Sequence, residues 1–135
     1  SGGIGADPPA CNMYVYSRVG SSEPASYTIT HNGSTGAVVQ ILTYNLTAPT
    51  GFVDAYQITV HSNDLTNLPA TAATTTVANT MIVGFFAVNT QSYTGYSIAP
   101  PSGMTERAET YSTGGTRLLV ESCDVAQVSV GTTGE

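Results

Sequence analysis

The sequence has few charged residues and contains neither Lys nor Trp. Charged residues make up 9% of the 135-residue chain, against about 25% in an average soluble domain. The absence of Lys excludes mechanisms that need its amine, including Schiff-base chemistry and the phosphate-binding Lys of P-loops. Three Arg residues and a formal net charge of −6 also argue against a nucleic-acid partner, because cationic side chains must neutralise the phosphates.

Long apolar runs and good helix formers are also scarce. No stretch reaches the roughly 18 apolar residues of a membrane-spanning helix, so we expect no membrane partner. Few Leu and Glu residues and no Lys are available, which argues against a helical bundle. Abundant Thr alternates instead with Val, Ile, Tyr and Phe, which suit a pleated, half-buried surface.

Only two cysteines occur, Cys11 and Cys123, near opposite ends of the chain. Two interpretations stay open. A disulfide between them would close a very long loop, the case in which chain-entropy models give the most stabilisation. Alternatively, both are small apolar core residues that never meet.

Alternating and apolar segments between Gly, Pro and Asn residues predict an all-β fold. Residues 79–88 are the most hydrophobic segment and predict a buried central strand, in which Gly84 marks a close backbone approach or a bulge. Short turns predict a single domain over residues 1–135, an antiparallel two-sheet β-sandwich, jelly-roll-like, with about seven or eight strands. The expected strands are 13–19, 27–31, 37–44, 55–61, 79–88, 104–111 and 117–125, and 93–98 and 128–130 are candidates for a further short strand.

Several segments resemble a β-sandwich module of bacteriophage virion proteins (tail- and fibre-associated) and of phage-like bacterial surface proteins. They are residues 15–19 (VYSRV) with 22–28 (SEPASYT), 37–44 (AVVQILTY), 77–83 (VANTMIV) and 100–107 (PPSGMTER). The resemblance implies a sandwich fold, no cofactor, no enzymatic activity, and a place on a virion or an extracellular surface. Such modules have a strand before the first motif and another after the last. The chain is therefore either a complete domain or a fragment lacking flanking strands.

Acidic and His residues offer few candidates for catalysis. The best local cluster, residues 61–64 (HSND) with Asp54, has no recognised ligand spacing, so we expect a hairpin turn and no metal site. No Gly-x-Ser-x-Gly nucleophile elbow occurs. Glu106 and Glu109 are an odd number of positions apart. We therefore expect them to face opposite sides of a polar edge strand, exposed to solvent, and not to pair as glycosidase carboxylates. No catalytic residue and no cofactor is expected.

Tyrosines are the candidate binding residues. Tyr14 and Tyr16 share one face of a predicted strand, and Tyr93 and Tyr96 flank Gly95 in a turn. Exposed rings can stack on sugar faces with a hydroxyl at the rim, but Tyr also packs sheet faces and subunit interfaces. Both interpretations, a glycan site and an interface, stay open for these four residues.

These observations favour a non-enzymatic structural or adhesion module that acts through protein–protein contacts. Lys commonly protects sheet edges from pairing, and this chain has none. We therefore expect self-association, with strand complementation between copies, or binding to neighbouring virion subunits. The alternative is a carbohydrate-binding module that uses exposed tyrosines to bind a surface glycan.

Overall fold

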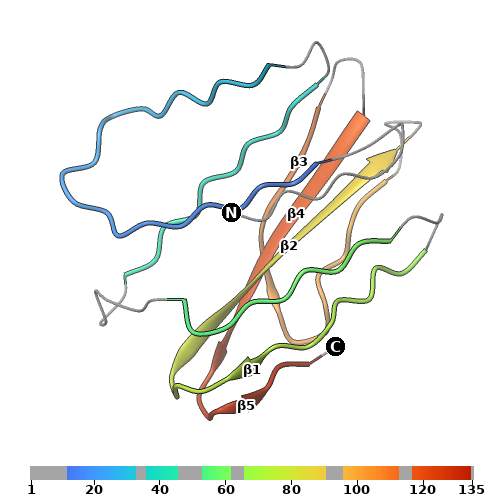
Figure 1. Cartoon of the computed structure of the whole chain (residues 1–135). Coiled ribbons are helices and arrows are strands. Elements are labelled where there is room, and N and C mark those ends of the chain that lie inside the picture. Colours follow the sequence, from blue (N-terminus) through green and yellow to red (C-terminus); the bar gives the residue numbers. More distant parts are fainter. Residues whose placement is uncertain are drawn as a thin grey trace.

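The computed structural model describes residues 12–32, 36–45, 53–61, 66–90, 96–112 and 117–134, and all of its regular structure is β (Figure 1). The strands are β1 (Thr74–Thr75), β2 (Thr80–Thr90), β3 (Thr105–Tyr111), β4 (Arg117–Gln127) and β5 (Gly131–Thr132). The prediction of an all-β chain is confirmed. A search of the described ranges finds no helix with the length and apolar character to cross a membrane.

The strands form two antiparallel sheets, one in the order β2–β4–β3 and one made of β1 and β5. The strands predicted at 79–88, 104–111 and 117–125 correspond to β2, β3 and β4. β4 lies between β2 and β3, so the central place predicted for 79–88 was wrong and belongs to β4. The edge strand expected at 104–111 is confirmed as β3, which begins at Thr105. Residues 128–130 precede β5 and form no strand themselves, and 96–98 also lie outside the strands.

The strands predicted at 13–19, 27–31, 37–44 and 55–61 are not paired into a sheet within the described residues. Residues 53–61 nevertheless run antiparallel to the segment that leads into β1. Side-chain hydrogen bonds fix this alignment: Asp54 accepts from the backbone N of Thr76 at 2.6 Å, and the Thr59 hydroxyl donates to Thr71 Oγ1 at 3.0 Å. The described residues thus contain five strands, and the sandwich itself is not among the observed features.

Residues 36–45 lie over one face of the larger sheet, as Figure 1 shows. Gln40 Nε2 donates to the carbonyl of Val120 at 3.1 Å, and Tyr44 Oη donates to Asp124 Oδ2 at 2.7 Å. Both pairs are separated by 80 residues in the sequence. Since the offset is constant, this segment follows β4 in the same direction.

A β-bulge interrupts the pairing of β3 with β4. Glu106 is the register partner of Cys123, but Ala108 is the partner of Ser122, so Arg107 is an extra residue. Residues of β4 point alternately to two faces of the sheet. We call the face that bears Ser122 and Asp124 the Asp124 face, and the face that bears Glu121 and Cys123 the Glu121 face.

The most deeply buried part of the chain is the middle of β4. Glu121, Ser122 and Cys123 have no exposed surface, and Asp124 is 1% exposed. The strand is covered by β2 on one edge, by β3 on the other, and by residues 36–45 across the Asp124 face. Gly84 is the register partner of Cys123, and a Cβ at Gly84 would come within 3.1 Å of the Cys123 sulfur. The predicted close backbone approach is therefore confirmed, and no bulge occurs in β2.

Candidate functional site

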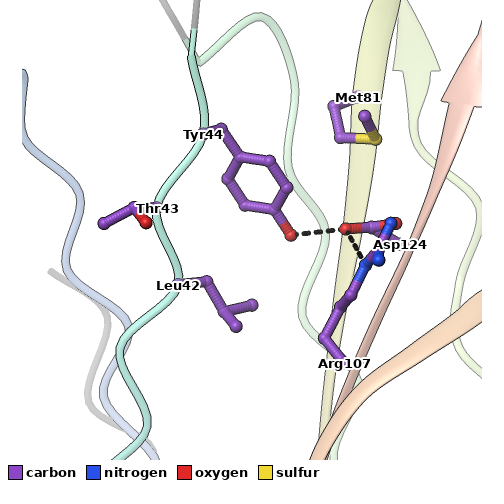
Figure 2. A pocket seen from close by; sticks show the side chains of 6 residues that line it. All are labelled: Leu42, Thr43, Tyr44, Met81, Arg107 and Asp124. Atoms are coloured by element: carbon purple, nitrogen blue, oxygen red, sulfur yellow. Dashed lines mark hydrogen bonds and ion pairs between the residues drawn. The ribbon is translucent and has the colours of Figure 1, made fainter.

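The strongest polar constellation joins three residues from three parts of the chain. Arg107 donates two hydrogen bonds to Asp124, from Nε to Oδ2 and from Nη2 to Oδ1, both at 2.8 Å. Tyr44 Oη donates a third at 2.7 Å to Oδ2. Bidentate Arg–carboxylate pairs are among the strongest hydrogen-bonded pairs in proteins. The Asp124 carboxylate thus ties residues 36–45 to both β3 and β4 (Figure 2).

The bulge explains how Arg107 reaches Asp124. Thr105 is the register partner of Asp124, and the extra residue lets a second side chain of β3 turn toward the same face. The Arg107 side chain is 47% exposed, whereas that of Asp124 is 2% exposed. A buried carboxylate is thereby paired with a guanidinium that keeps part of its hydration, which lowers the desolvation cost of the pair.

An open groove of about 280 Å³ lies beside this constellation. The groove is lined by Leu42, Thr43 and Tyr44 of the overlying segment and by Met81, Arg107 and Asp124 of the sheet. Figure 2 shows Leu42 and Tyr44 pointing toward the sheet residues, whereas the Thr43 side chain points away from them. The groove is partly apolar and contains one ion pair that is already satisfied within the protein. The polar groups of the groove therefore already form the contact between residues 36–45 and the larger sheet.

The electrostatics of the constellation keep each group in one protonation state near neutral pH. Hydrogen bonds from Arg107, and then from Tyr44, hold the pKa of Asp124 below its usual value. Burial, followed by the hydrogen bond to Asp124, raises the pKa of Tyr44 to about 12. The hydrogen bonds to Asp124 also raise the pKa of Arg107. Since a general acid or base works best with a pKa near the operating pH, this arrangement suits a fixed structural contact.

The Glu121 face carries a second constellation, which corrects the prediction for β3. Glu106 is the register partner of Cys123 and Glu109 is the register partner of Glu121. Because Cys123 and Glu121 are two positions apart on β4, Glu106 and Glu109 lie on the same face. The prediction that they face opposite sides was wrong, since it assumed a regular strand without the bulge at Arg107. Glu109 is also half-buried, and its Oε2 accepts from Ile98 N at 2.7 Å.

The carboxyl group of Glu121 is buried without a hydrogen-bond partner among the described residues. This holds for both of its oxygens, and the side chain has no exposed surface. Burial, with the nearby charges of Glu106 and Glu109, raises the pKa of Glu121 to about 7. An unpartnered buried carboxyl is unusual, because a buried polar group without a hydrogen bond is costly.

The structure brings two of the four predicted tyrosines together. Tyr14 and Tyr16 are stacked with ring centroids 6.5 Å apart and planes 16° apart, and they are 55% and 78% exposed. Tyr96 is 58% exposed on a different segment. Tyr93 lies outside the described residues. The shared strand face predicted for Tyr14 and Tyr16 is thus present as an exposed ring pair.

Asp54 and His61, which belong to the cluster considered in the sequence, make separate local contacts. His61 Nε2 lies 2.8 Å from the carbonyl of Pro69. The Asp54 carboxylate accepts from the backbone N of Thr76 and Val77, and the bonds from Thr76 lower its pKa. Residues 62–64 lie outside the described ranges. Within those ranges no group of three or more His, Cys, Asp or Glu residues is placed to hold a metal ion.

Cys123 is a free, buried thiol. Its sulfur lies 3.7 Å from that of Met104, and burial raises its pKa. A protonated thiol with no exposed surface is a poor nucleophile. Cys11 lies outside the described residues.

Sequence analysis missed the roles of Tyr44, Gln40, Arg107 and Asp124. One signal could have indicated the ion pair. Asp124 falls near the end of the predicted strand 117–125, between Cys123 and Val125, and a carboxylate buried there requires a cation. The chain offers only three Arg and no Lys, so Arg107, on a neighbouring predicted strand, was a reasonable partner. Comparison of the chain with family models, curated proteins and solved structures gives no match.

Proposed function

We propose that this chain is a non-enzymatic structural or adhesion module of the phage-virion type, on a virion or another extracellular surface. It acts by binding a second copy of itself. One observation carries the proposal: the segments predicted as strands before residue 62 expose large apolar side chains and belong to no sheet in the described ranges. Ile29, Ile41 and Tyr56 are 61%, 59% and 76% exposed.

Exposed apolar rows with unpaired backbone are suited to strand addition. An extended segment can add to an open edge through main-chain hydrogen bonds, while its alternate side chains fill pockets on the partner. In a dimer, such a segment would pair with the open edge of the corresponding segment in the second copy. Contiguous apolar patches on a soluble protein commonly mark such interaction surfaces.

The charge distribution favours a second copy as the partner. Within residues 12–61 the charged side chains are Arg18, Glu23 and Asp54. Arg18 and Glu23 neutralise each other in an ion pair of 2.7 Å, and Asp54 is held by backbone amides of the β1 segment. Two copies can therefore bring these segments together without opposing like charges, even though the whole chain has a net charge of −6.

The same segments support a more complete fold than the five observed strands. Residues 36–45 already follow β4 across the Asp124 face, and residues 53–61 already run beside the β1 segment. Pairing of these segments in an assembly would give a jelly-roll-like β-sandwich of about seven or eight strands. We propose this as the assembled form of the module.

Light scattering after size exclusion, over a range of concentrations, tests the proposal. We expect dimers or larger assemblies, and slow amide hydrogen exchange in residues 27–31 and 37–44 when the protein is assembled. Ile29→Lys and Ile41→Lys should shift the population toward monomer, because an edge Lys opposes strand pairing. Val128→Lys is the matched control, since Val128 is 71% exposed outside these segments. A folded chain that remains monomeric at the highest concentrations would refute the proposal.

The Tyr14–Tyr16 pair favours a second candidate, a carbohydrate-binding module. Its two rings are stacked and exposed, and such rings can cover the apolar face of a sugar. A glycan array followed by titration of the best ligand tests this candidate. Tyr14→Ala and Tyr16→Ala should each abolish binding, while Tyr56→Ala, at an equally exposed ring, should not. Absence of any array signal would exclude the candidate.

A further inference from the structure

We infer that Glu106, Glu109 and Glu121 form a proton-controlled latch that holds β3 against β4. When Glu121 is uncharged the latch is closed, and loss of its proton opens it. This inference concerns the stability of the sheet and is independent of the partner proposed above.

The geometry of the Glu121 face places three carboxyl groups around one buried position. Glu109 is the direct cross-strand partner of Glu121, and Glu106 lies one pair further along the same face, opposite Cys123. Like charges directly opposite one another in a sheet are destabilising. The bulge at Arg107 creates this juxtaposition, since a regular strand would turn one of the two β3 glutamates away.

Among the described residues of the strands packed against it, none places a positive charge next to Glu121. From β2, its register partner is Phe86, and the next residue on that face toward Cys123 is Gly84. From β3 it faces Glu109, with Glu106 and Tyr111 on either side. On β4 itself, the Cys123 thiol shares the face. Arg117 also shares this face but is four residues away, about 13 Å along the strand at 3.3 Å per residue.

The burial of Glu121 makes the latch responsive to protons. Both carboxyl oxygens lack partners in the described residues, and the side chain has no exposed surface. The uncharged carboxylic acid tolerates such a position far better than the carboxylate. In the β2–β4–β3 order, β3, like β2, is paired on one side only. Because the two repelling carboxylates lie on β3, release of β3 both exposes Glu121 to water and separates the like charges.

The sign of the pH dependence follows from the two states. In the open state Glu121 has its ordinary pKa of 4.5, and in the closed state its pKa is about 7. Between these values the closed state holds a proton that the open state releases, so a rise in pH favours opening. For one proton, the opening equilibrium changes about tenfold per pH unit in this window. Above the upper pKa both states are ionised and the dependence levels off.

Amide hydrogen exchange of the full chain, corrected for the intrinsic effect of pH, tests the latch. We expect protection of the β3 amides to fall roughly 40-fold between about pH 5 and about pH 7, the size expected for one proton with a pKa of 4.5 in the open state and about 7 in the closed state. Glu121→Gln, which cannot ionise, should remove this dependence. Glu109→Gln should retain it but lower the pH at which it levels off, because one repelling charge is gone. Glu23→Gln, at the remote ion pair with Arg18, is the control and should behave as the wild type.

A second measurement keeps the inference testable if Glu121→Gln does not fold. The side-chain carboxyl carbon of Glu121, followed by NMR in the wild-type chain, should titrate well above the ordinary range of a glutamate. Titration of Glu121 in the ordinary range, or an unchanged pH dependence of β3 protection in a folded Glu121→Gln chain, would overturn the latch.

Discussion

Glu106 and Glu109 lie on the same face of β3 although three positions separate them in the sequence. In a regular strand, residues an odd number of positions apart point to opposite faces. The extra residue, Arg107, removes that difference and places its own guanidinium on the other face, against Asp124. A single inserted position therefore determines both polar constellations of the larger sheet.

Deletion of Arg107 should destabilise the chain about as much as Arg107→Gln does. Both variants remove the ion pair with Asp124, and the deletion leaves Glu106, Ala108 and Glu109 opposite the same β4 partners in a regular strand. We expect each variant to cost about 3 kcal/mol, because the buried Asp124 carboxylate loses its cation. Urea unfolding of both variants measures the losses. A much larger loss in the deletion variant would show that the bulge stabilises the fold independently of the Arg107 guanidinium.

Tyr44→Phe should lower the free energy of unfolding by about 1.5 kcal/mol, the value for a hydrogen bond to a charged group at the lower end of its range. The substitution removes the 2.7 Å bond to Asp124 Oδ2 and retains the ring. Tyr56→Phe, at a ring 76% exposed, is the control and should change stability by less than about 0.5 kcal/mol. Similar losses in both variants would contradict a role for Tyr44 in attaching residues 36–45.

Acid should weaken the contact between residues 36–45 and the sheet. The pKa of Asp124 is below its ordinary value of 3.8 in the folded chain. Asp124 therefore contributes stability above that ordinary value, and the contribution disappears as the pH falls through the lowered folded pKa.

Thermal unfolding between about pH 5 and about pH 2 measures this loss, with the sign given by proton linkage. Asp124→Asn should be less stable than the wild type at the upper end and should show a shallower decline. Hydrogen bonds from Thr76 lower the pKa of Asp54. Asp54→Asn therefore measures the contribution of Asp54 to the loss of stability in acid separately from that of Asp124. An undiminished decline in Asp124→Asn would disprove the assignment.

Gly84→Ala should destabilise the larger sheet, although Ala normally replaces Gly in a strand at a small gain. The new Cβ would lie 3.0 Å from Phe86 Cε2 and 3.1 Å from Cys123 Sγ. Overpacking of this kind costs about 1–3 kcal/mol. Gly134→Ala is the control, because a Cβ there meets nothing within 4 Å. Chemical denaturation compares the two, and a neutral Gly84→Ala would show that the Phe86 ring moves aside freely.

The three long strands could be predicted because their patterns are local. Side-chain patterns and bounding turn residues indicate that 79–88, 104–111 and 117–125 suit a pleated surface, and these ranges correspond to β2, β3 and β4. The same pattern predicted strands at 13–19 and 27–31, where none is paired in the described residues. Alternation reports which side chains fit a sheet but contains no information about the partner strand.

The polar constellations depend on distant pairing and on the bulge. Tyr44 and Asp124 are 80 positions apart, and no local pattern joins them. The face of Glu109 depends on the insertion at Arg107, and the sequence TERAET has no glycine or other feature that marks a bulge there. The tyrosine pair was accessible to prediction because Tyr14 and Tyr16 are two positions apart, and strand geometry alone brings such rings to one side.

The buried sulfur of Cys123 gives the molecule its own reporter. It has no exposed surface and is covered by Met104 and by the close approach of Gly84. An alkylating reagent can reach it only after the strands around it separate. In a chain where Ser replaces Cys11, the rate of alkylation would therefore report how often this sheet opens, without any label added to the protein.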